Sequence, residues 1–215
     1  MSRILSQENS LVNVFISELR DVTIQKDSMR FRRNLERLGE IFAYEISKQL
    51  EYEVRDVVTP LGIAPTPVLK SQPVIATILR AGLPVHQGVL NYFDQAENAF
   101  VSAYRKHHKD NTFEIKVEYM SSPDLTDKTL IICDPMLASG QSMLLAYKAL
   151  LQRGKPRHIH VIGLIASVEG LQYIKSHFPE NTSFWMGAVD DEMTAKSYIV
   201  PGLGDAGDLA YGQKI

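Results

Sequence analysis

Residues 130–154 read LIICDPMLASGQSMLLAYKALLQRG, and this segment indicates the class of fold. Its opening residues, 130–133, are a short apolar run that predicts a buried strand. The segment 138–142 is rich in glycine and serine and predicts a loop, and helical spacing of apolar residues follows from near Ser142 until Gly154. A strand, a tight loop and a helix in this order are typical of the crossover unit of a parallel sheet.

Similar apolar runs recur along the chain. Each ends in small or charged residues, and in two clear cases a helical pattern follows. This alternation predicts the α/β class, with a mainly parallel twisted sheet flanked by helices on both faces. Ligands of such sheets bind at the carboxyl ends of the strands. The runs are Val74 to Leu79, Phe100 to Tyr104, Leu130 to Cys133, Ile159 to Ala166 and Phe184 to Val189.

The N-terminal part of the chain, about residues 8–50, is predicted to be helical. Apolar spacing predicts a short helix over Leu11 to Leu19 and a longer one that Ser28 caps and that extends toward Leu50. On the longer helix four arginines lie opposite the apolar stripe, and we interpret them as a solvated face without a site. They are Arg30, Arg32, Arg33 and Arg37.

Two further segments are predicted to form strand pairs outside the crossover units. Residues 52–67 alternate and then contain proline and glycine, which predicts a strand and a turn in a surface ribbon. Residues 105–122 predict a β-hairpin with one wet face, projecting as a hood or flap, with KHHKDN as its turn. The adjacent His107 and His108 do not have the spacing of metal ligands.

Composition limits the class of protein. The 215 residues, 45% of them hydrophobic, suffice for one core, so we expect a single domain, residues 1–215. A formal net charge of -2 gives no general attraction for nucleic acid or an anionic membrane, so a phosphate site must be local. Cys133 is the only cysteine, which excludes an internal disulfide and a multi-thiolate metal site, and we interpret it as a core residue. The chain contains neither a membrane span nor a signal peptide, and we expect a cytoplasmic protein.

The loop after the strand at 130–133 predicts an anion site. Gly140 has no Cβ, so backbone amides and the positive end of the following helix can approach a phosphate closely. Ser139 and Ser142 add hydroxyl donors, and an anionic Asp134 suits the hydroxyls of a sugar. A nucleotide-triphosphate P-loop would need a lysine where Gln141 stands, and a hydrolase elbow would need glycines around its serine. An ordinary crossover helix capped by Ser142 remains the alternative.

These residues carry a resemblance to a known family. DPMLASGQS at 134–142 is similar to the motif by which uracil phosphoribosyltransferases bind 5-phosphoribosyl 1-diphosphate (PRPP). ILRAGL at 78–83, YIVPGLGDAGD at 198–208 and FRRNLERLGEIFAYEIS at 31–47 resemble further segments of that family. The resemblance implies the type I phosphoribosyltransferase fold and the conversion of uracil and PRPP to UMP and pyrophosphate, in pyrimidine salvage. It also implies Mg²⁺ carried by PRPP without direct protein ligands, and a homo-oligomer, a dimer or larger.

The resemblance also implies which residues bind and act. Arg80 and Arg105 would hold the pyrophosphate as its charge grows, and with Asp205 they are the candidate catalytic residues. The segment 198–208 would present its backbone to uracil. PRPP would contact Arg80, Arg105, Asp134, Pro135, Met136, Leu137, Ala138, Ser139, Gly140, Gln141, Ser142 and Asp205. Uracil would contact Ile199, Gly204, Asp205 and Ala206.

Departures from the family pattern leave some points open. Gln141 stands where the family has a second glycine, which requires that the backbone there not need a positive φ. The hood sequence and DDEMTAKSYI at 190–199 are unlike most members, and no general base can be named, although Asp205 is a candidate. GLGDAG at 202–207 matches a dinucleotide fingerprint, but only eight residues follow it. Two alternatives stay open, namely an RNA-binding regulator of pyrimidine genes with this fold, and a phosphoribosyltransferase for another base.

Overall fold

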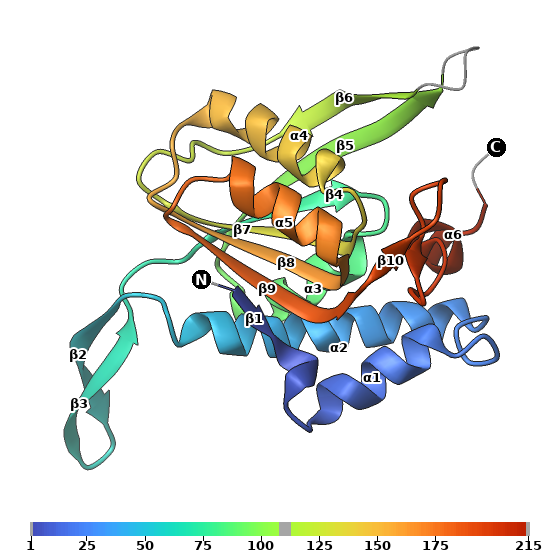
Figure 1. Cartoon of the computed structure of the whole chain (residues 1–215). Helices are drawn as coiled ribbons and strands as arrows, with labels where there is room; N and C mark the ends of the chain where they lie inside the picture. Colours follow the sequence, from blue (N-terminus) through green and yellow to red (C-terminus); the bar gives the residue numbers. More distant parts are fainter. Residues whose placement is uncertain (1, 108–112, 214–215) are drawn as a thin grey trace.

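A seven-stranded sheet forms the centre of the molecule in the computed structural model, which describes residues 2–107 and 113–213 (Figure 1). The strand order is β1-β9-β8-β7-β4-β5-β6. All neighbouring pairs are parallel except β5 and β6, which confirms the predicted mainly parallel sheet. The strands are β1 (Ser2–Ile4), β4 (Val74–Leu79), β5 (Glu97–His107), β6 (Phe113–Ser121), β7 (Thr129–Leu137), β8 (His158–Ser167) and β9 (Thr182–Asp190).

Helices cover both faces of this sheet (Figure 1). Alternate residues of β7 show why: Ile131 and Cys133 pack on the face with α1, α2 and α3, whereas Leu130 and Ile132 pack on the face with α4 and α5. A strand buried on both faces is apolar throughout, as the run at 130–133 indicated. The helices are α1 (Leu11–Arg20), α2 (Ser28–Ser47), α3 (Leu83–Tyr92), α4 (Gln141–Leu150), α5 (Val168–His177) and α6 (Ala206–Tyr211), with short 3-10 turns η1 (Leu5–Gln7) and η2 (Leu151–Arg153).

The two N-terminal helices confirm the predicted apolar spacing but correct one cap. The N-cap of α2 is Asp27, whose carboxylate accepts the backbone N–H groups of Met29 and Arg30, so Ser28 is the first helical residue. Aspartate accepts these amides at least as well as serine, and its charge also suits the positive helix end. The helix ends at Ser47, before the predicted Leu50.

Two hairpins project from the ends of the molecule (Figure 1). β2 (Tyr52–Thr59) pairs antiparallel with β3 (Gly62–Leu69), and most of their residues are exposed, which confirms the surface ribbon. β5 and β6 form the predicted hood, although residues 108–112 of its turn, which include His108, lie outside the described residues. Among the described residues, no helix has the length and apolar character needed to cross a bilayer.

β1 was not predicted from the sequence. It pairs with β9 through the register Ser2–Phe184, Arg3–Trp185 and Ile4–Met186. Three residues are too few to show a periodic pattern, so only the neighbouring strand reveals this edge.

Candidate active site

Asp134 lies inside β7, not after its end as predicted. Pairing with β4 stops at Cys133, but pairing with β8 continues as far as Leu137. Pro135 therefore lies where one side of β7 has no partner strand, a position that a residue without an N–H tolerates. The carboxylate of Asp134 is half-buried at the place where the sheet opens on one side.

The carboxylate of Asp134 has an unusual proton affinity. Burial raises the pKa of Asp134 to about 7, against the opposing effect of a hydrogen bond that the Met136 amide donates to Oδ1 over 3.3 Å. The sequence led us to expect a plain anion, whereas at neutral pH the free protein holds this group partly protonated. Hydroxyl donors from a ligand would favour the ionised form.

The loop before α4 has the geometry of an anion site. Gly140 is the N-cap of α4 with φ of 76°, and no side chain caps the helix. A Cβ at Gly140 would lie 2.8 Å from Cγ2 of Ile174, so both the backbone and the packing require glycine. Gln141 is the first residue of α4, which confirms that it needs no positive φ. Ser142 lies within the helix, so it does not cap the crossover.

Ser167 holds this loop against α5 and was missed by the sequence reasoning. Its Oγ donates to the carbonyl of Ala138 over 2.7 Å and accepts the amide of Gly170 over 2.8 Å. A Cβ on Gly170 would lie 1.9 Å from the oxygen of Ala138, so the loop and the helix touch through backbone. A serine between a strand and a helical pattern weakly predicts an N-cap for the helix. Nothing in the sequence predicts that Ser167 also contacts the loop at Ala138.

Arg80 follows β4 and reaches the C-terminal segment. Its Nη2 donates to the carbonyl of Gly212 over 3.1 Å and lies 3.6 Å from Oδ1 of Asp208. The guanidinium is 40% exposed, so it remains accessible to a ligand. Arg105 lies in β5 opposite Ile115, but its side chain is outside the described part of the structure.

The segment 198–208 forms a turn built mainly from backbone. Within it, β11 (Ile199–Val200) pairs antiparallel with β10 (Glu192–Met193). Gly202 and Gly204 follow with φ of 55° and 93°. Asp205 is the N-cap of α6, and its Oδ1 accepts the amide of Asp208 over 3.0 Å. Asp205 thus has the structural role of a cap in addition to any role toward a ligand.

The loop before α4 and this C-terminal turn pack on the same face of the sheet, the face covered by α1, α2 and α3. Ile199, Leu203 and Ala206 are buried in the hydrophobic cluster on this face, and Met136 and Ala138 pack against it. Segments separated by about sixty residues in the sequence are attached to the ends of the neighbouring strands β8 and β9, since Ser167 binds the carbonyl of Ala138 and Asp190 accepts the amide of Gly202. The carboxyl ends of the strands are the expected place for a ligand.

Arg32 corrects the view of the arginines on α2 as a purely solvated face. Its Nη1 donates to the carbonyl of Ala210 over 2.7 Å, and its guanidinium lies 5.9 Å from the ring centre of Tyr211. Arg32 therefore fixes α6. A cavity of about 580 Å³ opens beside it, lined by Glu36, Leu83, Pro84, His86, Gln87, Leu90, Asn98, Phe100 and Tyr211.

Cys133 is fully buried behind this site. Burial raises the pKa of its thiol, and the neighbouring Asp134 raises it further. The thiol is thus neutral and enclosed, as expected of a core residue and not of a nucleophile. Among residues 2–107 and 113–213, no three His, Cys, Asp or Glu side chains gather as a metal site would require.

Comparison with known proteins shows the family. The family model described as "Uracil phosphoribosyltransferase" matches residues 6–213. A uracil phosphoribosyltransferase of Porphyromonas gingivalis is 60% identical over 211 residues, which cover 98% of each chain. Among solved structures, the AQ2163 protein from Aquifex aeolicus has a TM-score of 0.88 at 29% identity and covers 100% of both chains.

A more distant structure supports the fold alone. A hypoxanthine phosphoribosyltransferase from Staphylococcus aureus has a TM-score of 0.50 at 12% identity, covering 84% of this chain and 82% of that one. The mainly parallel sheet with helices on both faces has the type I phosphoribosyltransferase fold, and the antiparallel hairpins are present in addition to it. With a family model that spans nearly the whole sequence, the chain belongs to the uracil phosphoribosyltransferase family.

Proposed function

We propose that this chain transfers the phosphoribosyl group of PRPP to uracil, giving UMP and pyrophosphate. The observation that carries the proposal is the attachment of two different loops to the carboxyl ends of the neighbouring strands β8 and β9. One loop offers uncapped amides at a helix start, which suit a phosphate. The other offers a glycine-rich backbone, which suits the edge of a planar base.

PRPP would lie along the end of β7 and the start of α4. The 5-phosphate accepts the amides of residues 138–142, with hydroxyl donors from Ser139 and Ser142. Asp134 accepts the ribose hydroxyls, and this contact draws the carboxylate into its ionised form because burial alone favours the protonated one. Pro135, Met136 and Leu137 contribute backbone that connects these two subsites.

Uracil would lie against the turn of residues 199–206. Its polar edge presents an acceptor, a donor and an acceptor, and main-chain amides and carbonyls near Gly204 and Ala206 supply the complement. Ile199 adds an apolar wall. A base with an exocyclic amine would place a donor against a donor, and buried sites reject such a mismatch strongly.

The reaction then depends on positioning and charge. The bond between the anomeric carbon and the pyrophosphate oxygen breaks, its electron pair leaves with the pyrophosphate, and a ring nitrogen of uracil forms the new bond and loses its proton. Arg80 and Arg105 hold the leaving pyrophosphate as its charge grows. Asp205 lies at the junction of the two subsites and is the candidate that takes up the proton.

Mg²⁺ fits this arrangement as a partner of the substrate. Mg²⁺ keeps several of its waters and binds substrate phosphates, so it would arrive with PRPP and would need no direct ligand from the protein. Bound with PRPP, the ion would neutralise part of the diphosphate charge.

We also propose that residues 1–215 act as one catalytic domain in a cytoplasmic homo-oligomer. The hairpin β2–β3 supports an assembly, because the apolar residues Val58, Leu61 and Ile63 near its tip are strongly exposed. Light scattering coupled to size-exclusion chromatography checks the assembly, and a monomer would refute it.

The activity is tested by incubating the protein with PRPP, Mg²⁺ and each of uracil, cytosine, thymine, hypoxanthine and adenine. We expect UMP from uracil and no product from the other bases above a small fraction of that rate. Arg80→Gln serves as a variant that removes one pyrophosphate contact. Transfer to a purine, or no product with any base, would refute the proposal.

A further inference from the structure

The end of β9 carries a partly buried ion pair that lies outside the residues expected from the sequence. Asp190 is the last residue of β9 and is 8% exposed. Arg20, at the end of α1, donates from Nη1 to Oδ2 and from Nη2 to Oδ1 of Asp190, each over 2.7 Å. Such bidentate pairing fixes the plane of both groups, and a charged pair so enclosed requires both partners.

Both members of this pair hold the same residue of the C-terminal turn. Arg20 Nη1 donates to the carbonyl of Gly202 over 2.8 Å, and the amide of Gly202 donates to Oδ2 of Asp190 over 2.9 Å. The two polar backbone groups of Gly202 are therefore held by one pair of side chains. A Cβ on Gly202 would lie 2.2 Å from the carbonyl oxygen of Ile199, so the turn is tight where it is held.

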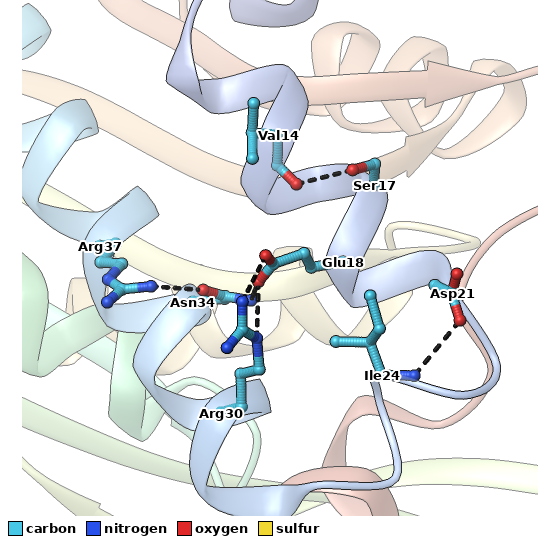
Figure 2. A network of polar contacts seen from close by, with 8 residues as sticks. All are labelled: Val14, Ser17, Glu18, Asp21, Ile24, Arg30, Asn34 and Arg37. Atoms are coloured by element: carbon cyan, nitrogen blue, oxygen red, sulfur yellow. Dashed lines mark hydrogen bonds and ion pairs between the residues drawn. The ribbon is translucent and has the colours of Figure 1, made fainter.

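The position of Arg20 is itself fixed by neighbouring contacts. Figure 2 shows that Glu18, two residues earlier on α1, reaches α2, where it accepts hydrogen bonds from Arg30 and Asn34. Asn34 in turn accepts from Arg37 over 3.1 Å. These hydrogen bonds, from Arg30 first and then Asn34, hold the pKa of Glu18 below its usual value, so the contact persists at neutral pH. The end of α1 is thus attached to α2 as well as to β9.

A parallel arrangement holds the other loop. Ser167 is the last residue of β8, lies beside Asp190 in the register of β8 and β9, and holds the carbonyl of Ala138. Two adjacent strand ends therefore each hold one loop: Ser167 the phosphate loop and Asp190 the turn at Gly202. The relative position of the two loops depends on these two strand ends.

We infer that Arg20 and Asp190 are positioning residues for uracil, since they fix Gly202 and through it the backbone of residues 199–206. Neither residue touches the substrates in this assignment, and the inference rests on the proposed function of that turn. Binding of uracil should depend strongly on the pair, whereas binding of PRPP to the free enzyme, which would meet this turn only through Asp205, should depend on it little.

The test compares Asp190→Asn and Arg20→Lys with Ser167→Ala as the matched control. For Asp190→Asn we expect the KM for uracil at saturating PRPP to rise roughly tenfold, because a hydrogen-bonded charge pair is lost next to the turn. Arg20→Lys keeps the charge and one donor, so in this variant the KM for uracil should rise by only about threefold. The Kd of PRPP, measured by calorimetry, should stay within about twofold for both variants. Ser167→Ala should show the reverse, with weaker PRPP binding and an unchanged KM for uracil.

Amide hydrogen exchange gives a second readout that needs no activity. In Asp190→Asn, amide exchange should become faster in residues 199–206 and change less in residues 134–142. In Ser167→Ala, exchange should become faster in residues 134–142 and change less in residues 199–206. If the unaltered protein makes no UMP, the proposed function fails, and this exchange result alone decides whether the pair holds the turn.

Three results would overturn the inference. They are an unchanged KM for uracil, an equal loss of PRPP affinity in the Asp190 and Arg20 variants, or unchanged exchange in residues 199–206. A pair that matters only for stability would lower the fraction of folded enzyme. In that case kcat would fall while the KM for uracil stayed the same.

Discussion

Replacing Asp134 by asparagine should stabilise the free protein while weakening the binding of PRPP. Burial raises the pKa of Asp134 from 3.8 to about 7, so ionising this group costs the folded state free energy that the unfolded chain does not lose. Asparagine has nearly the same shape and no charge, and its oxygen can still accept the Met136 amide.

The magnitude follows from that pKa difference. A difference of about three pKa units corresponds to roughly 4 kcal/mol at about 1.4 kcal/mol per unit, which is an upper limit. Because Asp134 is only half-buried, we expect Asp134→Asn to gain about 1 to 3 kcal/mol of unfolding free energy near pH 8.

The sign of the pH dependence is fixed by the raised pKa. The cost of ionisation is complete above a pH of about 7 and is gone once the pH falls below 3.8, where the carboxyl is protonated in both the folded and the unfolded state. The advantage of Asp134→Asn over the unaltered chain should therefore shrink steadily from about pH 8 to about pH 5. Urea unfolding can be followed by the fluorescence of Trp185, the only tryptophan, which is buried.

Asp124→Asn is the matched control of opposite sign. The amide of Thr126 and then its hydroxyl donate to Asp124 and hold its pKa below 3.8, so this carboxylate stabilises the fold when ionised. Its replacement should destabilise the protein at neutral pH, and the loss should fade as the pH falls below about 4.

Asp134→Asn also tests the assignment of Asp134 to the ribose hydroxyls. The affinity of Asp134→Asn for PRPP with Mg²⁺ should fall roughly tenfold to a hundredfold, since the acceptor for two hydroxyls loses its charge. A variant less stable than the unaltered chain near pH 8, or a difference that does not change with pH, would refute the reasoning about burial. Unchanged PRPP affinity would refute the ribose contact.

Three further predictions follow from other sites. Burial, with a further effect of the charge of His158, lowers the pKa of His160 to about 3. The stability gained from neutral His160 is therefore present above about pH 6.5 and is lost as the pH falls toward about 3. His160→Gln should flatten this loss of stability in urea unfolding, and an unchanged dependence on pH would contradict the prediction. Gly140→Ala should cost about 1 to 3 kcal/mol of stability, measured by thermal unfolding, and should weaken PRPP binding, measured by calorimetry. The control is Gly212→Ala, which has φ of 83° but no atom within 4 Å of the added Cβ, and it should cost about 1 kcal/mol or less. Asp205→Asn should keep the cap of α6 and lower kcat far more than it weakens PRPP binding; equal losses in steady-state kinetics and calorimetry would contradict its catalytic role.

Local patterns in the sequence were sufficient to predict the crossover units. The apolar run at 130–133 reflects a strand buried on both faces, and the apolar spacing on α2 reflects a helix buried on one face. Both kinds of burial can be read from the type and the spacing of the side chains. Gly140 predicted the loop before α4, because few residues other than glycine adopt a positive φ. The segments 78–83, 134–142 and 198–208 indicated the family, which the comparisons confirm.

The tertiary structure alone decided how these parts are held together. Arg20, Ser167 and Asp190 show no motif, because the contacts between Arg20 and Asp190 and between Ser167 and Ala138 join residues that are distant in the sequence. No local period encodes such contacts. The continuation of β7 past Cys133 depends on β8 as a partner, and the raised pKa of Asp134 depends on what the fold packs around it. Because loop chemistry is local, the amino-acid sequence indicated which loops are candidates for binding a ligand. The spacing of these loops and the charge state of Asp134 follow from burial and strand pairing, which exist only in the folded chain.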